Sequence, residues 1–332
     1  MNDRQLTRPD APALLVAIPC LNEAATIAEV VQAVPRGIPS VGRVDVLVVD
    51  DGSTDDTAAR AEAAGARVLR HPRNRGVGSA FQSAVDYALE NDYQLMVNID
   101  GDRQFDPQDI PKLVVPIVSG QAEMATASRF IDPRMVPDMP RVKLHGNRMM
   151  SALISGLVRR RFADVSCGFR CYSRDALLRL SLHGAFTYTQ ETFLDFAAKR
   201  VEIVEVPIQV KYFADRKSRV AGSIWRYAIN ALKIILRGYR DYFPLRFFWG
   251  IALALAIPAL AFGGLFFWHY LTTGKFVGYL YAGFLSAFLT GMSVLFLVVG
   301  IVADMLDRIR ANQERILLAI RRRSVRGNEA HK

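Results

Sequence analysis

The chain has few cysteines, whose disulfides define small secreted scaffolds. It contains three cysteines in 332 residues, Cys20, Cys167 and Cys171, which is too few for a disulfide framework. It has no internal repeat or low-complexity tract. No N-terminal run reads as a signal peptide, because the apolar stretch 14–18 is short and leads into Pro19. A hydrophobic content of 51% excludes a disordered chain. We therefore expect a globular part that faces a reducing cytoplasm.

Charged residues are absent from two long segments nearer the C-terminal end. Residues 247–271 hold none, and neither do residues 276–303. About 20 apolar residues are enough to cross a bilayer. Because only residues 272–275 join the two segments, they predict a tight transmembrane hairpin. Two buried core helices are the alternative reading, but a soluble core rarely needs two such runs in tandem.

Basic residues flank this hairpin and account for much of the net charge of +10. Arg237, Arg240 and Arg246 precede it, and eight Lys or Arg residues follow residue 303. The connecting turn holds a single Lys. The positive-inside rule therefore predicts a multi-pass protein of the cytoplasmic membrane with both termini in the cytoplasm. Since the basic excess has a membrane explanation, it argues against a nucleic-acid partner.

The hairpin divides the chain into four predicted parts. Residues 1–220 form a cytoplasmic globular domain, 221–246 an interfacial segment, 247–303 the hairpin, and 304–332 a basic cytoplasmic helix or tail. The interfacial segment mixes aromatic and aliphatic residues with Arg and Lys, as a helix in the headgroup layer requires. Apolar residues of the tail recur at roughly helical spacing, which suits packing on the domain or on another subunit of a homo-oligomer.

The first 130 residues alternate short apolar runs with helical segments. Strands are predicted at residues 14–18, 44–49, 67–69 and 95–99, with helices at about 24–34 and 78–90. Continuous apolar strands separated by helices indicate an α/β fold with a mostly parallel sheet that is covered on both faces. Ligands of such sheets bind in the crevice beyond the carboxyl ends of the strands.

Polar residues gather where the predicted strands end, and the sharpest cluster is Asp100-Gly101-Asp102. Two carboxylates two residues apart can converge on one hard cation, and Gln104 supplies a further oxygen. Mg²⁺ or Mn²⁺ is commonly held by one or two carboxylates together with substrate phosphates. A solvated turn is the alternative, but the position at a strand end favours the metal site.

A second polar cluster, Arg75-Gly-Val-Gly78, precedes a predicted helix. It lacks the third glycine of a dinucleotide-binding loop and follows the third strand instead of the first. A helix start beside Arg75 still suits a phosphate, because free backbone N–H groups and a guanidinium both favour an anion.

Six motifs carry a family resemblance. They are Ile18-Pro-Cys-Leu-Asn-Glu23, Val48-Val-Asp-Asp-Gly-Ser-Thr-Asp55, Asn74-Arg-Gly-Val-Gly-Ser-Ala80, Asp100-Gly-Asp-Arg-Gln104, Ala127-Ser-Arg-Phe130 and Ser166-Cys-Gly-Phe-Arg170. In this order they resemble family 2 glycosyltransferases of the GT-A fold. With the hairpin, the chain most resembles polyprenyl-phosphate glycosyltransferases, relatives of dolichol-phosphate mannosyltransferase. The resemblance covers about residues 13–303 and implies a Rossmann-like GT-A domain.

The resemblance implies roles for the matching residues. The nucleotide-sugar donor would be bound by Pro19, Glu23, Asp50, Asp51, Asp100 and Gln104, and Arg75 joins this set through the helix-start argument. The metal ion, Mg²⁺ or Mn²⁺, would be held by Asp100, Asp102 and Gln104. Catalysis would depend on Asp102, Asp100 and Arg129.

The acceptor phosphate is expected to meet basic residues. The resemblance points to Arg129 and to the segment 141–147, with Arg141 and Asn147, and to a phosphate-closing loop that matches residues 216–223 through Arg216 or Arg219. The Gly-to-Ser spacing in that loop is one residue shorter than usual. Lipid-headgroup binding is the alternative for these arginines, and it is also one reading of residues 159–161.

The nature of the acceptor follows from its ionisation. A lipid monophosphate, with a second pKa of about 6, is largely ionised at pH 7 and needs little help from a general base. A hydroxyl acceptor would need one. Where relatives that use hydroxyls carry an acidic pair, this chain has Gln190–Glu191. The Gln-x-x-Arg-Trp signature of processive synthases is also absent. Glu191 and Asp164 are candidate polar residues of the site, with ordinary surface or capping carboxylates as the alternative.

The expected reaction is therefore an inverting, metal-dependent transfer of a sugar from a UDP- or GDP-sugar to a polyprenyl phosphate. In bacteria the resemblance implies undecaprenyl phosphate. One alternative is a transferase that acts on a glycolipid hydroxyl. Another is a non-catalytic membrane subunit that binds nucleotide-sugars, against which the intact Asp100/Asp102 pair argues.

Overall fold

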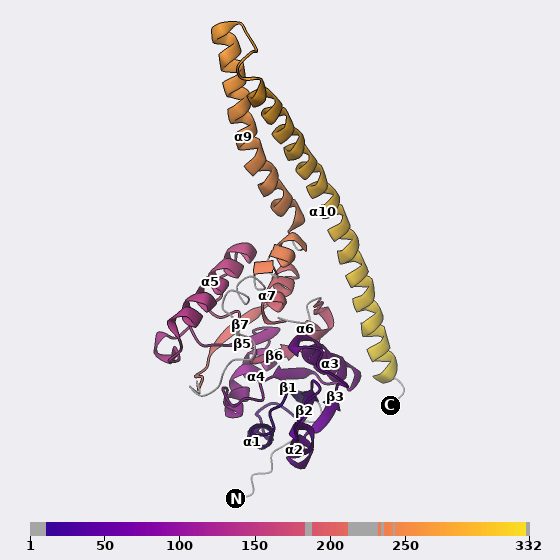
Figure 1. Ribbon diagram of the computed structural model, residues 1–332. Coiled ribbons are helices and arrows are strands. Elements are labelled where there is room, and N and C mark those ends of the chain that lie inside the picture. The colour runs from indigo at the N-terminus through magenta and orange to yellow at the C-terminus, as the bar shows by residue number, and fades with distance from the viewer. Residues whose placement is uncertain (1–10, 183–187, 212–231, 234–235, 242, 330–332) are drawn as a thin grey trace, which may run out of the picture. The chain divides into compact units, whose positions relative to one another are not determined.

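The computed structural model describes residues 11–182, 188–211, 232–233, 236–241 and 243–329. By internal contacts the chain forms two compact units, one made of Met1–Ile235 with Ile320–Lys332 and the other of Leu236–Ala319. The first unit holds an α/β domain and the second holds two long helices (Figure 1). Most of the predicted interfacial segment, together with the loop 216–223, lies outside the described residues.

A sheet of seven described strands lies at the centre of the first unit. The strands are β1 (Ala13–Cys20), β2 (Arg43–Asp50), β3 (Arg67–Arg70), β4 (Leu95–Asn98), β5 (Met124–Ser128), β6 (Arg170–Ser173) and β7 (Ile203–Pro207). Their order across the sheet is β3-β2-β1-β4-β6-β5-β7. Neighbours are parallel except at β6, which runs antiparallel to β4 and β5. The predicted α/β fold with a mostly parallel sheet is confirmed, and all four predicted strands are present.

The helices of this unit fill the connections and cover the sheet. In chain order they are α1 (Ile27–Ala33), α2 (Thr57–Ala63), α3 (Val77–Glu90), η1 (Pro107–Asp109), α4 (Ile110–Val118), η2 (Pro133–Met135), α5 (Arg141–Val158), α6 (Arg174–Arg179) and α7 (Tyr188–Ala198). Helix α3 packs on β1, β2 and β4, and α4 packs on β5 and β6. Residues 14–18 of β1 are at most 1% exposed, as expected for a central strand covered on both faces.

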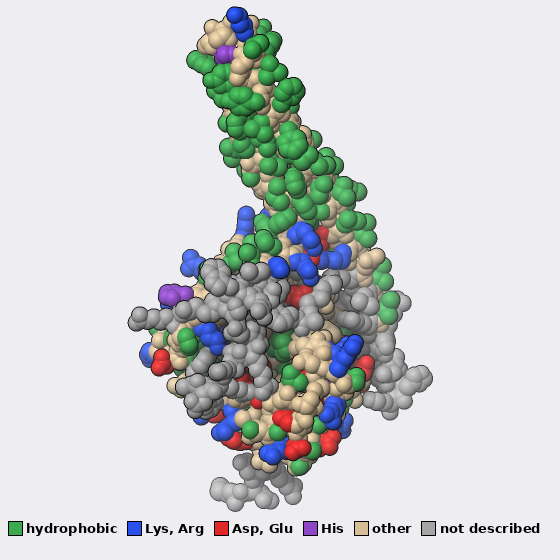
Figure 2. All heavy atoms as spheres, viewed as in Figure 1, with side chains coloured by type: hydrophobic (Ala, Val, Ile, Leu, Met, Phe, Trp, Pro, Cys, Tyr) green, Lys and Arg blue, Asp and Glu red, His purple; other side chains and the backbone are tan. Residues whose placement is uncertain are grey.

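The second unit contains helix α9 (Pro244–Thr273) of 30 residues and most of helix α10 (Leu280–Glu329) of 50 residues, up to Ala319. Residues 244–273 and 280–313 are long and apolar enough to cross a membrane, judged by length and composition. Figure 2 shows hydrophobic side chains over the part of the unit where the two helices run together. Helix α10 continues beyond residue 303 without a break, so the predicted tail begins inside a helix.

The connection between these helices is longer than predicted. Helix α10 begins at Leu280 instead of near residue 276. Gly274 and Gly278 have φ angles of 66° and 107°, which end the helical path. Phe276 stacks on Tyr270 at 4.3 Å between ring centroids and so belongs to the turn.

Small residues bring α9 and α10 together. The Ser286 hydroxyl donates to the Ala259 carbonyl at 2.8 Å, and the Ser293 hydroxyl donates to the Ala252 carbonyl at 2.9 Å. The two contacts repeat after one heptad on each helix, the period of left-handed helix packing. A side chain added at Gly263 would come within 2.7 Å of the Ser286 hydroxyl, so this glycine allows the close approach.

Candidate active site

The loops that follow β1 and β2 are joined by hydrogen bonds. The Asn22 amide donates to the Ser53 hydroxyl, and the Thr54 amide returns a bond to the Asn22 side chain, both at 2.8 Å. The Glu23 amide donates to the Thr57 hydroxyl at 2.8 Å. Because β1 and β2 are parallel neighbours, these bonds fix two strand ends at one edge of the sheet. Pro19 and Glu23, predicted to bind the donor, lie on this edge, Pro19 buried within β1.

The acidic pair at the end of β2 is buried and hydrogen-bonded within the domain. One Asp50 oxygen accepts from the Ser53 amide at 2.8 Å, and the Arg70 guanidinium lies 3.2 Å from the other. Asp51 accepts from the backbone amides of Arg75 at 3.0 Å and of Gly76 at 2.7 Å. The Asp51 carboxylate therefore holds the loop that carries Arg75, a role the sequence did not indicate.

A histidine completes this arrangement. His71 Nδ1 lies 2.7 Å from Asp51 Oδ1, and its Nε2 lies 2.9 Å from the Ser83 hydroxyl on α3. The imidazole is 4% exposed. It thus connects the end of β2 to α3, and it was not among the predicted site residues. The Arg75 side chain itself is exposed at the start of that helix.

The loop after β4 carries the predicted metal ligands. Asp100, Asp102 and Gln104 are all half-buried. The Gly101 carbonyl accepts from the Thr26 hydroxyl at 2.8 Å, which ties the loop to the start of α1. The Gln104 amide donates to Asp102 Oδ1 at 3.1 Å, so the loop folds back on itself.

The residues of this loop fit a divalent cation that takes its other ligands from outside the protein. Among the described residues no group of three or more His, Cys, Asp or Glu side chains could hold a metal ion by itself. Two carboxylates and one amide are too few to enclose an ion. They match Mg²⁺ or Mn²⁺, which take their remaining oxygens from substrate phosphates and water.

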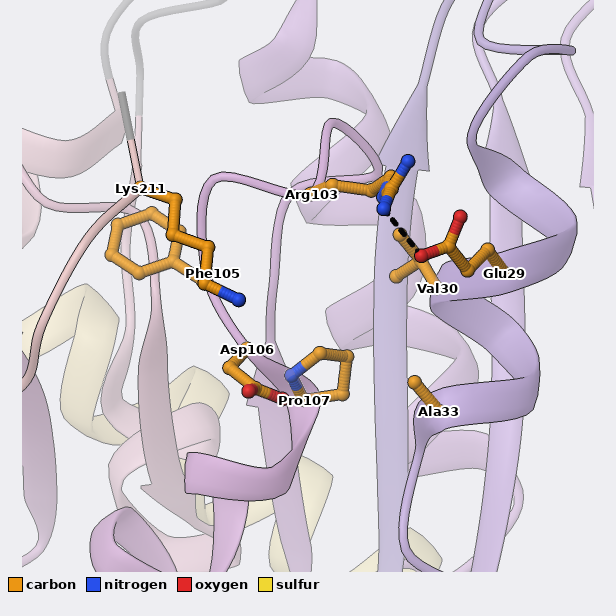
Figure 3. Close-up of a pocket in the computed structure, with 8 residues that line it drawn as sticks. All are labelled: Glu29, Val30, Ala33, Arg103, Phe105, Asp106, Pro107 and Lys211. Atoms are coloured by element: carbon orange, nitrogen blue, oxygen red, sulfur yellow. Dashed lines mark ion pairs between the residues drawn. The ribbon is translucent and has the colours of Figure 1, made fainter. Parts of the chain in front are cut away.

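A small hollow of about 130 Å³ lies beside the same loop, lined by residues of α1 and of the segment 103–107 and by Lys211. Figure 3 shows Arg103 reaching from the loop to Glu29 on α1, with Lys211 on the other side. The Arg103–Glu29 ion pair measures 2.6 Å. Arg103 has a φ of 62°, a left-handed conformation that is strained for arginine. None of the predicted donor or metal residues lines this hollow.

Arg129 forms a buried ion pair with Asp164. Arg129 Nε and Nη2 lie 2.6 and 2.8 Å from the two Asp164 oxygens, a bidentate geometry. Arg129 is 8% exposed and Asp164 is fully buried. Glu205 in turn accepts the Asp164 amide at 2.8 Å. Asp164 is therefore not a surface carboxylate. It accepts from the Ser166 amide at 3.1 Å and fixes the guanidinium predicted to meet the acceptor phosphate.

The other predicted acceptor residues are spread over several elements. Arg141 opens α5 and Asn147 is half-buried in the same helix, whereas Arg216 and Arg219 lie outside the described residues. Arg160 contacts β7: its guanidinium donates to the Ile203 carbonyl at 2.8 Å.

Three residues beside the loop after β4 that carries Asp100 and Asp102, here called the metal loop, were not predicted. Asn98, Arg170 and Tyr188 are 0%, 0% and 3% exposed. Asn98 Nδ2 donates to the Tyr188 hydroxyl at 2.9 Å. Burial, and then the nearby Asp100 carboxylate, raise the pKa of Tyr188 well above its usual value, so Tyr188 is a neutral hydroxyl at physiological pH. The only signal was the Ser166–Arg170 motif, to which no role was given. Gln190 is buried beside them and Glu191 is half-buried.

Similarity to known proteins agrees with the fold. Residues 15–180 match the family described as Glycosyl transferase family 2. Glycosyltransferase AglJ of Haloferax volcanii is 31% identical over 200 residues, which cover 60% of this chain and 63% of the relative. Polyprenol monophosphomannose synthase of Mycolicibacterium smegmatis is 27% identical over 228 residues, which cover 65% of this chain and 83% of the relative.

Solved structures show the same architecture. Glucosyl-3-phosphoglycerate synthase of Mycobacterium tuberculosis superposes with a TM-score of 0.52 and 27% identity, over 68% of this chain and 80% of that one. Its complex with Mn²⁺ and UDP-glucose gives a TM-score of 0.51 at 26% identity, over 68% of this chain and 79% of the other. The chain therefore belongs to glycosyltransferase family 2 and is a glycosyltransferase of the GT-A type.

Proposed function

We propose that this glycosyltransferase moves a sugar from a nucleotide-sugar to a polyprenyl phosphate at the cytoplasmic face of the membrane. The observation that carries the proposal is the presence, in one chain, of a GT-A donor edge with Asp100 and Asp102 and of two helices able to cross a bilayer. A polyprenol chain cannot leave the bilayer, so an enzyme that uses it must work at the membrane surface. The relative named polyprenol monophosphomannose synthase supports the same acceptor.

On the donor side, the loop after β4 would hold Mg²⁺ or Mn²⁺ through Asp100, Asp102 and Gln104. When bound, the cation would neutralise charge on the leaving diphosphate. The solved relative with bound Mn²⁺ and UDP-glucose supports a metal-dependent donor site. Pro19, Glu23 and Asp50 would contact the nucleoside at the adjoining strand ends. Asp51 would act through the loop that it holds, by presenting Arg75 to the diphosphate.

On the acceptor side, Arg129 would bind the lipid phosphate. Its bidentate pair with Asp164 fixes the guanidinium before the substrate arrives, which reduces the ordering cost of binding. The phosphate is ionised at neutral pH and attacks the anomeric carbon directly, which inverts the configuration there. This step needs no general base, in keeping with Gln190 at the position where a base would stand.

The membrane part would anchor the enzyme where its acceptor resides. Helix α9 and the first part of α10 would span the bilayer, with the turn at Lys275 outside and both termini in the cytoplasm. The segment 221–246 would lie among the headgroups, and the remainder of α10 would extend into the cytoplasm. This division assigns residues 1–220 to catalysis.

A transfer assay tests the proposal. Purified full-length protein in nanodiscs receives Mn²⁺ or Mg²⁺, undecaprenyl phosphate and a panel of labelled UDP- and GDP-sugars, with Asp102→Ala as the control. We expect organic-extractable, acid-labile label that requires the lipid phosphate, the metal and Asp102. Parallel reactions contain a glycolipid hydroxyl acceptor or 3-phosphoglycerate, the latter because solved relatives carry that name. Label in either of these arms, and none with the polyprenyl phosphate, would overturn the proposed acceptor.

A further inference from the structure

Gly168, in the Ser166–Arg170 motif, packs against the metal loop without a side chain. A Cβ added at Gly168 would lie 3.0 Å from the Tyr188 hydroxyl and 3.4 Å from each carboxylate oxygen of Asp100. The Asp100 carboxylate and the Tyr188 hydroxyl thus both lie against a residue that has no side chain. A methyl group at this position would crowd both of them.

The Tyr188 side chain is held by a ring contact and by a hydrogen bond. Its ring stacks on Phe81 of α3, with centroids 4.3 Å apart and planes at 14°. Asn98 Nδ2 donates to the Tyr188 oxygen at 2.9 Å and to the Gly168 carbonyl at 3.0 Å, which uses both amide hydrogens. Because the tyrosine oxygen accepts from Asn98, its own proton is available to a separate acceptor. The Asp100 carboxylate lies against the same glycine.

Arg170 anchors the helix that carries the tyrosine. Its Nη2 donates to the Thr189 carbonyl at 2.9 Å, in the first turn of α7, and to the Val165 carbonyl at 3.3 Å. The guanidinium lies over the Phe193 ring at 4.8 Å. The arginine is fully buried, and no carboxylate partner is found for it among the described residues. One motif therefore supplies both the opening at Gly168 and the anchor for Tyr188.

We propose that Tyr188 is a positioning residue for Asp100: its hydroxyl, oriented by Asn98, donates to the Asp100 carboxylate and holds it in the geometry that binds the metal and the donor diphosphate. This inference rests on the proposed metal site. One oxygen of Asp100 is restrained by the hydroxyl, while the remaining lone pairs of the carboxylate serve the cation. Partners that orient a ligand in this way commonly change metal affinity about 10–100-fold when removed.

Two matched substitutions separate positioning from packing. Tyr188→Phe keeps the ring that stacks on Phe81 and removes only the hydroxyl. Tyr172→Phe is the control, because Tyr172 also packs near Phe81, at 5.7 Å. Tyr172 pairs with Met96, two residues before Asn98 along β4. It therefore lies farther than Asn98 from the loop that follows this strand. Thermal melting checks that both variants remain folded.

The experiment measures binding instead of turnover. Mn²⁺ is titrated into the full-length protein in detergent with saturating UDP, and with GDP in a parallel series, while electron paramagnetic resonance reports the free ion. We expect Asp100→Asn to abolish tight binding, Tyr188→Phe to weaken it about tenfold, and Tyr172→Phe to leave it unchanged. Gly168→Ala should also weaken it, because the new methyl group displaces the hydroxyl.

The outcomes distinguish the two proposals. If the wild-type protein binds no Mn²⁺, or Asp100→Asn binds as the wild type does, the metal site fails and the role of Tyr188 fails with it. If Asp100→Asn loses binding but Tyr188→Phe matches Tyr172→Phe, the metal site stands and the positioning role is overturned. A loss in Asp100→Asn, Tyr188→Phe and Gly168→Ala, with Tyr172→Phe unchanged, supports it.

Discussion

At the scale of single residues, the Arg129–Asp164 pair is a buried ion pair of the domain. Both groups are buried and their geometry is bidentate. Removing one partner of such a pair leaves an uncompensated charge, which costs about 3–5 kcal/mol of unfolding free energy. We expect Asp164→Ala to lower the thermal midpoint of the α/β domain strongly, as followed by circular dichroism.

The exposed pair of Arg134 with Asp132 provides the control for this prediction. Arg134 is 89% exposed and the contact measures 2.9 Å. Solvent screens such pairs, so Arg134→Ala should melt close to the wild type. Equal midpoints for Asp164→Ala and Arg134→Ala would show that the buried pair contributes no more than the exposed one.

Gly52 gives a second prediction at this scale. Its φ is 82°, and an added Cβ would lie 2.6 Å from the Arg73 carbonyl carbon and 2.7 Å from the Asn74 nitrogen, both backbone atoms that cannot move aside cheaply. Gly65 has a similar φ of 90° with nothing within 4 Å. Gly65→Ala should therefore carry only the conformational cost, about 1–2 kcal/mol.

Gly52→Ala should be destabilised by more than Gly65→Ala in chemical denaturation. It should also weaken UDP or GDP binding, because the loop displaced by the new methyl group is the one that Asp51 holds. If the two variants unfold at the same denaturant concentration, the backbone contact at Gly52 is not tight.

The same residues show what a sequence can reveal about a site. Asp100 and Asp102 were predicted because an acidic pair directly after an apolar strand has a local signature. The partners of Asp51 have none: His71 is 20 residues away, and the Arg75 and Gly76 contacts are made by backbone amides. Tyr188 reaches the metal loop from a helix about 90 residues along the chain, so only the folded sheet brings it there.

At the scale of elements, periodicity predicted strands and helices well where one residue pattern dominates. It did not predict that β6 runs antiparallel, because orientation depends on the connection and not on the strand itself. It also missed the turn at 276–279, where the apolar run continues while Gly274 and Gly278 leave the helical region. For this reason, composition predicts the length of the hydrophobic run correctly but places the start of α10 too early.

The packing of α9 on α10 yields the prediction at this scale. Gly263→Ile would force a side chain into the Ser286 contact, and overpacking of this kind costs about 1–3 kcal/mol. The neighbouring Gly264 has nothing within 4 Å, so Gly264→Ile is the matched control. Ser293→Ala removes a single hydrogen bond within the hairpin, for which about 0.6 kcal/mol is typical.

Titration with SDS measures these effects. Trp249 packs against Gly300 and reports hairpin separation by fluorescence, in a background where Trp225 and Trp268 are replaced by Phe. The midpoint should fall most for Gly263→Ile, slightly for Ser293→Ala, and not at all for Gly264→Ile. A loss of equal size at both glycines would contradict the observed interface.

At the scale of the whole molecule, the three cysteines make the proposed topology testable. Cys20, Cys167 and Cys171 are all buried. Burial raises the pKa of Cys167 to about 12, and it raises the pKa of Cys20 and of Cys171 further. The thiolate is the reactive form, so these side chains stay unreactive at neutral pH. The unmodified protein should therefore remain unlabelled by a maleimide, which allows single cysteines to be introduced elsewhere.

Two positions then report the two sides of the membrane. Lys275→Cys lies in the turn between α9 and α10, and Arg308→Cys lies on α10 beyond the uncharged run 276–303, where the arginine side chain is 79% exposed. With both termini in the cytoplasm, a membrane-impermeant maleimide should label Lys275→Cys in intact cells and Arg308→Cys only after permeabilisation. The reverse pattern would place the catalytic domain outside, away from nucleotide-sugars. Labelling of both positions in intact cells would mean that the two helices do not cross the bilayer, and the acceptor would then have to reach the site by another route.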